Sequence, residues 1–142
     1  MEWAKLVPEL SVVDIQKSLY FYIEILGFKA KYERKEEFFA YIDLEGAQFM
    51  LDQISRANPS WQTAELNQPF GRGINFQIEI SDIDKLYQRI LKRKLSPFAE
   101  IKENWYRADD KLTGNREFLI QDPDGYLLRF FTDLGAKSTE AV

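Results

Sequence analysis

The chain has 142 residues, of which 45% are apolar and 30% charged, as in one globular domain or two small halves that share a core. Its net charge of −4 argues against nucleic acid as a partner and favours cationic ligands. Cysteine and histidine are both absent, which excludes disulfides, thiol catalysis and Ser-His-Asp catalysis. A metal site would need oxygen ligands alone, which suits Mg²⁺, Ca²⁺ or Mn²⁺.

The sequence contains no signal for membrane insertion or export. No apolar run approaches the ~18 residues that a membrane helix needs. The first ten residues lack the basic start and long apolar core of a signal peptide. Because there is also no cysteine, we expect a cytoplasmic protein.

The first half predicts one strand, a helix and three more strands. Residues 5–13 alternate apolar and polar side chains, and Pro8 within them indicates an edge, a bulge or a chain exchange. Asp14 caps a helix that runs to about Leu26, and Gly27 ends it. Three further strands are predicted at residues 28–33, 38–44 and 47–53.

The second half repeats this order after a polar segment, 54–72, that is either a linker or a binding loop. Asp82 caps the second helix, 68 residues after Asp14. The turn Asp122-Pro123-Asp124-Gly125 lies between two apolar runs and predicts a β-hairpin over 115–131. The other second-half predictions are strands at 73–81 and 97–106, a helix at 83–94, a loop at 107–114 and a flexible tail at 135–142.

The order β-α-β-β-β therefore occurs twice. We predict an α+β fold in which two βαβββ modules, about 5–53 and 73–133, form a curved, cup-like mixed sheet with helices on the outer face. Neither half is expected to be stable alone, because each has one helix on one open sheet.

Polar side chains gather on one face of the predicted strands. A half-buried sheet with one wet face would explain this. Amides and carboxylates mixed with large apolar side chains on a concave face instead indicate a ligand pocket, and loop aromatic rings would stack there on a flat or cationic ligand. The predicted ligand-binding residues are Glu9, Phe38, Met50, Asp52, Trp61, Asn75, Glu79, Trp105, Tyr106 and Arg129.

Three segments, VPELSVVDIQKSLYFYIEILGF, FQIEISDIDKLY and REFLIQDPDGYLLRFF, resemble the glyoxalase/bleomycin-resistance superfamily over about residues 5–133. They are most similar to its bleomycin-resistance branch. The resemblance implies the two-module fold. It also places the metal ligands of the superfamily's enzymes at Val7, Met50, Asn75 and Arg129. Only Asn75 could bind a metal and Arg129 would repel one, so no metal or cofactor is expected.

The resemblance implies a homodimer that holds a bulky, cationic, partly flat bleomycin-type antibiotic in clefts between subunits without modifying it. It also implies exchange of an N-terminal strand near Pro8. Glu9, Asp52 and Glu79 would then meet cationic groups of the drug. Two alternatives stay open. One is a metal-independent lyase or isomerase with Glu9 or Glu79 as base and Arg129 as electrostatic stabiliser. The other is a regulator or metabolite-binding protein on the same scaffold.

Overall fold

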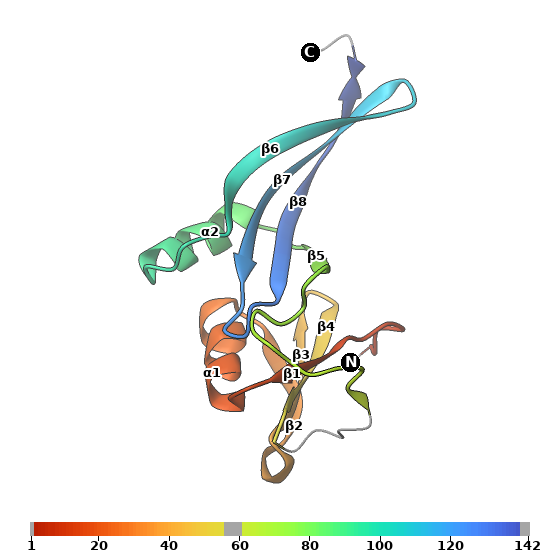
Figure 1. Cartoon of the computed structure of the whole chain (residues 1–142). Coiled ribbons are helices and arrows are strands. Elements are labelled where there is room, and N and C mark those ends of the chain that lie inside the picture. The colour runs from red at the N-terminus through yellow and green to blue at the C-terminus, as the bar shows by residue number, and fades with distance from the viewer. Residues whose placement is uncertain (1, 56–60, 140–142) are drawn as a thin grey trace. The chain divides into compact units, whose positions relative to one another are not determined.

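The computed structural model describes residues 2–55 and 61–139 and contains two compact units (Figure 1). Unit 1 comprises residues 1–74 and 122–126, and unit 2 comprises residues 75–121 and 127–142. Parts of the predicted linker (56–60) and of the predicted tail (140–142) lie outside the described residues. No helix in the described part of the chain is both long and apolar enough to cross a bilayer.

Unit 1 is a four-stranded mixed sheet with one helix. Its strands lie in the order β1 (Glu9–Val12), β4 (Ala47–Gln53), β3 (Phe39–Leu44) and β2 (Lys29–Arg34). Strand β1 runs parallel to β4, and the other pairs are antiparallel. The helix begins as α1 (Ile15–Leu19) and continues as the π-helix η1 (Tyr20–Ile25), and a 3-10 helix η2 (Lys35–Glu37) links β2 to β3.

The helix of unit 1 starts where the sequence predicts. The side chain of Asp14 accepts hydrogen bonds from the backbone N–H groups of Gln16 and Lys17, at 2.9 and 3.3 Å, and so satisfies donors that a helix start leaves open. Behind the helix lies an aromatic core. Tyr22, which is fully buried, packs edge-on against Phe28 and Phe49, with ring centroids 5.3 and 6.1 Å away.

The predicted hairpin turn is held by a buried carboxylate. Asp122 Oδ1 accepts hydrogen bonds from the backbone N–H groups of Asp124 and Tyr126, each at 2.9 Å. The hydroxyl of Tyr22 donates to Asp122 Oδ2 at 2.7 Å. The turn is thereby tied to the helix core of unit 1, although the strands on either side of it belong to unit 2.

Two more hydrogen bonds join this turn to the first strand and to the residue that follows it. The backbone N–H of Val13 donates to Asp124 Oδ1 at 3.1 Å, and the Tyr126 hydroxyl donates to the carbonyl of Ser11 at 3.0 Å. Gly125 has a φ of +95°, and a Cβ at this position would lie 2.4 Å from Pro69 Cβ. Glycine is therefore required here for both conformation and space.

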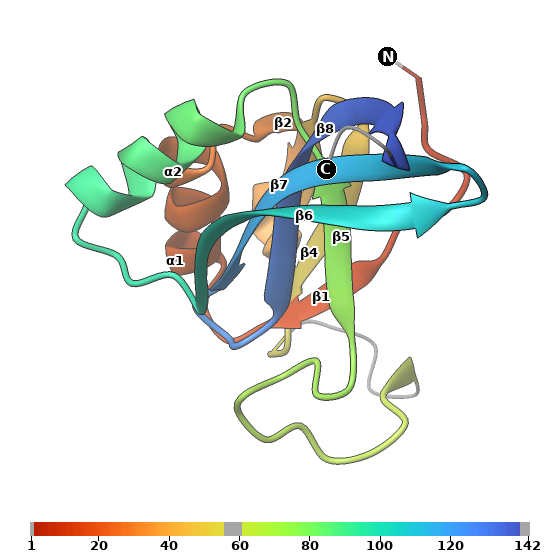
Figure 2. The ribbon, with the colours of Figure 1, turned by 90° about the horizontal axis from the view of Figure 1, so that it is seen from above.

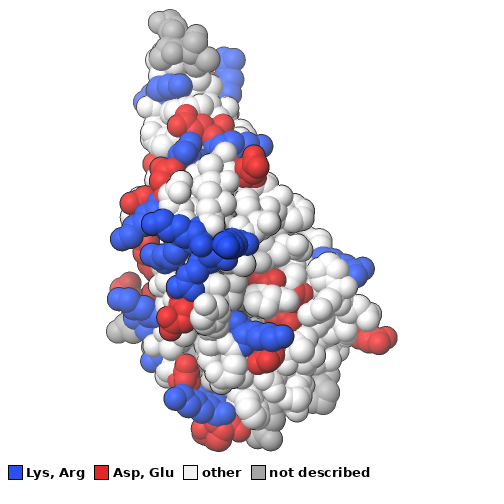
Figure 3. Space-filling view, turned by 90° about the vertical axis from the view of Figure 1, so that its left-hand side faces the viewer, with Lys and Arg blue, Asp and Glu red and all other residues white. Residues whose placement is uncertain are grey.

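Unit 2 has the same construction. Its strands lie in the order β5 (Asn75–Glu79), β8 (Leu127–Ser138), β7 (Lys111–Gln121) and β6 (Ala99–Ala108), with β5 parallel to β8 (Figure 2). Helix α2 (Ile83–Lys92) packs on one face, where Tyr87 lies 5.1 Å from Phe118 and Phe118 lies 5.6 Å from Phe130. Lysine and arginine side chains gather over α2 (Figure 3), and several stand near its C-terminal end, where the helix dipole favours cations.

The two predicted βαβββ modules are confirmed, each as a four-stranded mixed sheet. The first strand begins at Glu9 and not at residue 5, because Pro8 has no N–H to donate. The predicted loop 107–114 is mostly strand, with a turn at Asp109, whose φ is +58°. Residues 135–138 of the predicted tail are also strand, since they pair with residues 111–114.

Candidate functional site

The face of the unit 1 sheet that lies opposite α1 carries the predicted polar residues. Glu9 is paired with Met50, and Met50 with Tyr41, across β1, β4 and β3. One row further on, Ser11, Asp52 and Phe39 are aligned in the same way. Because paired residues point to the same side of a sheet, Glu9, Met50 and Asp52 share one face, as strand alternation predicts.

This face contains a hollow of about 340 Å³ lined by charged and aromatic side chains. The guanidinium carbon of Arg34 lies 4.1 Å from the ring centroid of Phe39, within cation–π range. Arg34 Nε also donates to Glu37 Oε2 at 2.7 Å. The lining residues are Arg34, Glu37, Phe39, Asp52 and Ser55.

The carboxylates of this face have a net excess of negative charge. Partial burial raises the pKa of Glu9 above its ordinary value, nearby Asp52 raises it further, and Arg34 lowers it. Burial likewise raises the pKa of Asp52, with Arg34 opposing and Glu37 adding to the rise. Arg34 is the shared counter-charge of three carboxylates, those of Glu9, Glu37 and Asp52. A further positive group would therefore stabilise their ionised forms.

An aromatic surface continues from the hollow along the same face. Tyr32 stacks on Tyr41 at 5.4 Å, and Trp3 packs edge-on against Tyr41 at 4.8 Å. The N-terminal segment is held there by Gln48, whose Oε1 accepts from the backbone N–H of Ala4 at 2.8 Å. Trp3 remains 57% exposed, so this surface presents aromatic area to solvent.

The corresponding face of unit 2 carries the other predicted strand residues. Asn75, Glu79 and Arg129 lie on one side of the sheet, as the pairing of β5 with β8 shows. Glu117 of β7 lies on the same side, since it pairs with Phe131 while Leu119 pairs with Arg129. Six of the predicted residues thus form two groups, with Glu9, Met50 and Asp52 in unit 1 and Asn75, Glu79 and Arg129 in unit 2.

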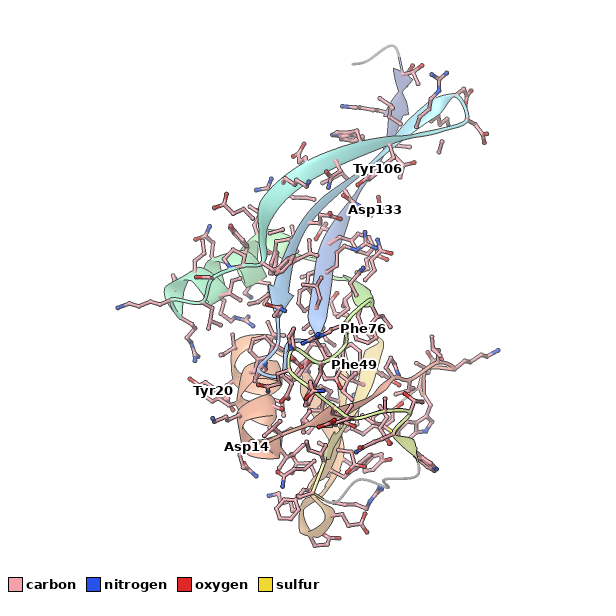
Figure 4. All side chains as sticks on the ribbon, viewed as in Figure 1. Asp14, Tyr20, Phe49, Phe76, Tyr106 and Asp133 are labelled. Atoms are coloured by element: carbon pink, nitrogen blue, oxygen red, sulfur yellow. The ribbon has the colours of Figure 1, made fainter. Side chains whose placement is uncertain are left out.

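The two aromatic residues of β6 point to opposite sides of the sheet. Trp105 pairs with Gly114 and lies flat on it, on the side away from Arg129. The ammonium of Lys137 lies 3.8 Å from the Trp105 ring centroid. Tyr106 lies on the side of Glu117 and is 54% exposed; Figure 4 labels it near Asp133 on the strands of unit 2.

Two predicted aromatic residues lie outside the strands. Phe38 precedes β3, with a φ of +53°, and is 39% exposed, so that its neighbour Phe39 lines the hollow instead. Trp61 lies in the loop after β4 and is 73% exposed. Strand alternation could have indicated that Phe39 lines the hollow. Ala40 and Ile42 are fully buried and point to one side of β3, so Phe39 and Tyr41 must point to the other side.

Three of the four positions that correspond, by resemblance, to metal ligands in the superfamily's enzymes hold unsuitable side chains. Val7 has no donor, Met50 offers only a weak thioether, and Arg129 is cationic. The described residues also contain no group of three His, Cys, Asp or Glu side chains arranged to hold a metal. The residues present therefore do not fit the metal chemistry of those enzymes.

A family model described as the Glyoxalase/Bleomycin resistance protein/Dioxygenase superfamily matches residues 6–130. The chain therefore belongs to this superfamily.

Among characterised relatives, the bleomycin resistance proteins of Geobacillus stearothermophilus and Staphylococcus aureus are each 29% identical over 137 residues, which cover 90% of this chain and 96% of theirs. Two solved structures share the fold. TioX from Micromonospora sp. ML1 has a TM-score of 0.71 at 17% identity, covering 93% of this chain and 100% of its own. A superfamily member from Alicyclobacillus acidocaldarius has a TM-score of 0.63 at 19% identity, covering 91% and 90%.

Proposed function

We propose that the protein binds a bulky, cationic and partly planar antibiotic of the bleomycin type and sequesters it in the cytoplasm without modifying it. The observation that carries this proposal is the open face of unit 1, where Glu9 and Asp52 lie beside an aromatic hollow. Carboxylates with raised pKa values gain from a cationic partner, and the partly exposed rings of Trp3 and Tyr32 offer aromatic area to planar groups. The bleomycin resistance proteins among its relatives support the choice of drug.

The first test is a titration of the full chain with metal-free bleomycin, followed by tryptophan fluorescence and calorimetry. We expect micromolar or tighter binding, with the drug recovered at unchanged mass. Absence of binding at millimolar drug would refute the antibiotic proposal. A change in the drug's mass would instead support catalysis on this scaffold.

Substitution of the unit 1 carboxylates should weaken this binding. We expect Glu9→Gln and Asp52→Asn each to raise the Kd by roughly tenfold, because each removes a partly buried charge that faces the ligand's cation. Glu65→Gln, an exposed loop carboxylate of the same unit, is the matched control and should leave the Kd unchanged. If Glu9→Gln and Asp52→Asn bind the drug as tightly as the control Glu65→Gln, the drug does not bind at these two carboxylates.

The same carboxylates predict how binding depends on pH. The pKa values of Glu9 and Asp52 are raised, so both side chains take up protons at a higher pH than ordinary carboxyls do. Affinity for a cation should therefore fall as the pH drops through these raised values. The double variant Glu9→Gln/Asp52→Asn should show a flatter dependence in the same calorimetric series.

We also propose that the chain forms a homodimer by exchanging β1 near Pro8. Among the described strands, β1 is an outer strand of its sheet and pairs with β4 alone, so an exchange breaks one ladder. Sedimentation equilibrium should give twice the chain mass of 16.7 kDa. A monomer at concentrations well above those used for drug binding would contradict the dimer.

A further inference from the structure

Glu117 is a buried carboxylate with one oxygen that no group in the described part of the chain satisfies. It lies in the middle of β7, is 7% exposed, and its Oε1 atom has no hydrogen-bond partner within the described ranges 2–55 and 61–139. Lys102, its pairing partner on β6, forms no ion pair with it among the described residues. The nearby amides of Asn104 and Asn115 bond to each other at 3.2 Å. A buried acceptor left open in this way costs stability.

A second unsatisfied group stands on the adjacent strand. Arg129 Nε is buried and also has no hydrogen-bond partner in the described part of the chain. Because Glu117 pairs with Phe131 and Leu119 pairs with Arg129, the two charged side chains are diagonal neighbours on one face. Their charged atoms are not within the 4.0 Å of an ion pair. A hydrogen-bond acceptor and a hydrogen-bond donor, both without partners among the described residues, therefore lie on neighbouring strands and do not bond to each other.

We propose that Glu117 and Arg129 form a subsite for a planar carboxamide. An amide N–H would donate to Glu117 Oε1, and the amide oxygen would accept from Arg129 Nε. A carboxylate could accept from Arg129 but has no proton to donate to Glu117, and an amidinium could donate to Glu117 but has no acceptor for Arg129. The pair therefore selects a neutral group that both donates and accepts. Leu119 and Phe131, each paired with one of these residues, offer apolar area to the attached ring.

This subsite consists of unit 2 residues, and its test does not depend on the identity of the drug. Three planar probes of almost the same shape test it: benzamide, benzoate and benzamidine. Each is titrated at millimolar concentration into ¹⁵N-labelled full chain, and the arginine Nε–H signals are followed. The signal of Arg129 is identified by its loss in Arg129→Met. We expect benzamide to shift this signal most.

Glu117→Gln should make the subsite more tolerant of the anionic probe, and Arg129→Met should make it more tolerant of the cationic probe. In Glu117→Gln the preference for benzamide over benzoate should fall by roughly tenfold, since the negative charge is gone. In Arg129→Met the preference for benzamide over benzamidine should fall by a similar factor. Because this variant has no Arg129 signal, its binding is followed by the backbone N–H signals of Glu117 and Leu119 on β7. Glu103→Gln is the control, because this exposed carboxylate of β6 pairs with Arg116 and so lies on the opposite face from Glu117; it should leave both preferences unchanged.

Two results would overturn the subsite. The first is an Arg129 signal that does not move with benzamide, which means that the two groups serve the fold alone. The second is an unchanged order of probe affinities in both variants. If one variant fails to fold, the other still decides, because each removes a different charge. Bleomycin binding that fails while benzamide selection holds would separate this inference from the proposed function.

Discussion

At the scale of single residues, Asp122 is a buried carboxyl group whose pKa is strongly raised. Burial raises its pKa to about 6, although hydrogen bonds from Tyr22 and from two backbone N–H groups oppose the rise. The ordinary value is 3.8. Between these values the folded chain binds a proton that the unfolded chain does not. The free energy of unfolding should therefore rise as the pH falls from about 6 towards 4.

Asp122→Asn tests this dependence. The amide oxygen can still accept from the backbone N–H groups of Asp124 and Tyr126, while the charge is gone. We expect the variant to gain less stability than the parent chain between about pH 7.5 and about pH 5 in urea unfolding. Asp110→Asn, in the exposed turn between β6 and β7, should behave like the parent. An unchanged pH slope in Asp122→Asn would show that other carboxyls cause it.

At this scale, strand alternation predicted which strand residues share a face of each sheet. It assigned Glu9, Met50 and Asp52 to one face, and Asn75, Glu79 and Arg129 to one face, because alternation is a property of the local backbone. It did not single out Glu117 or Arg34. The burial of Glu117 and the stacking of Arg34 on Phe39 depend on side chains of other strands, which alternation along one strand does not reveal.

At the scale of elements, the ribbon of β6, β7 and β8 depends on one glycine. A Cβ on Gly114 would lie 2.5 Å from the Trp105 ring, so the indole can lie on β7 only because this side chain is absent. The Lys137 ammonium, 3.8 Å from the ring centroid, links β8 to the same indole. The three strands are thus joined at this level by side chains as well as by backbone hydrogen bonds.

We expect Gly114→Ala to lower the free energy of unfolding by roughly 1–3 kcal/mol, because the ring must move off the strand. Thermal unfolding and near-ultraviolet circular dichroism would measure the loss. In a Trp105→Ala background the same methyl should cost much less, since the ring is gone. Equal costs in the two backgrounds would contradict the contact.

Element positions were predictable where the sequence carries caps and turns. Asp14, Asp82 and the Asp122–Gly125 turn mark helix starts and a hairpin, and all three are confirmed. The change from α-helix to π-helix at Tyr20 was not predicted, nor was the extension of β8 to Ser138. Residues 135–138 carry no strand signal of their own and are ordered by pairing with 111–114.

At the scale of the whole molecule, the repeat of the βαβββ order was predictable, but the borders of the two units were not. Unit 1 includes residues 122–126, which lie far from the rest of it in sequence. Hydrogen bonds from Tyr22 to Asp122, from Val13 to Asp124 and from Tyr126 to Ser11 make this turn part of its core. Such long-range bonds leave no periodic trace in the sequence.

A fragment of residues 1–74 should therefore fold poorly. It lacks the acceptors for Tyr22 and Val13, and Tyr22 would leave a buried hydroxyl without a partner. We expect little cooperative melting by circular dichroism, while the intact chain melts cooperatively. A fragment that melts at the temperature of the intact chain would show that the turn contributes little to unit 1.

The shared turn also limits how the gene can recombine. The chain crosses the border between the units three times, at 74–75, 121–122 and 126–127. A chimera that joins the first half of this gene to the second half of a relative would inherit a foreign turn in its first unit. Viable crossovers between homologues should therefore carry codons 122–126 together with the first half, even though the repeat in the sequence indicates a single seam near codon 74.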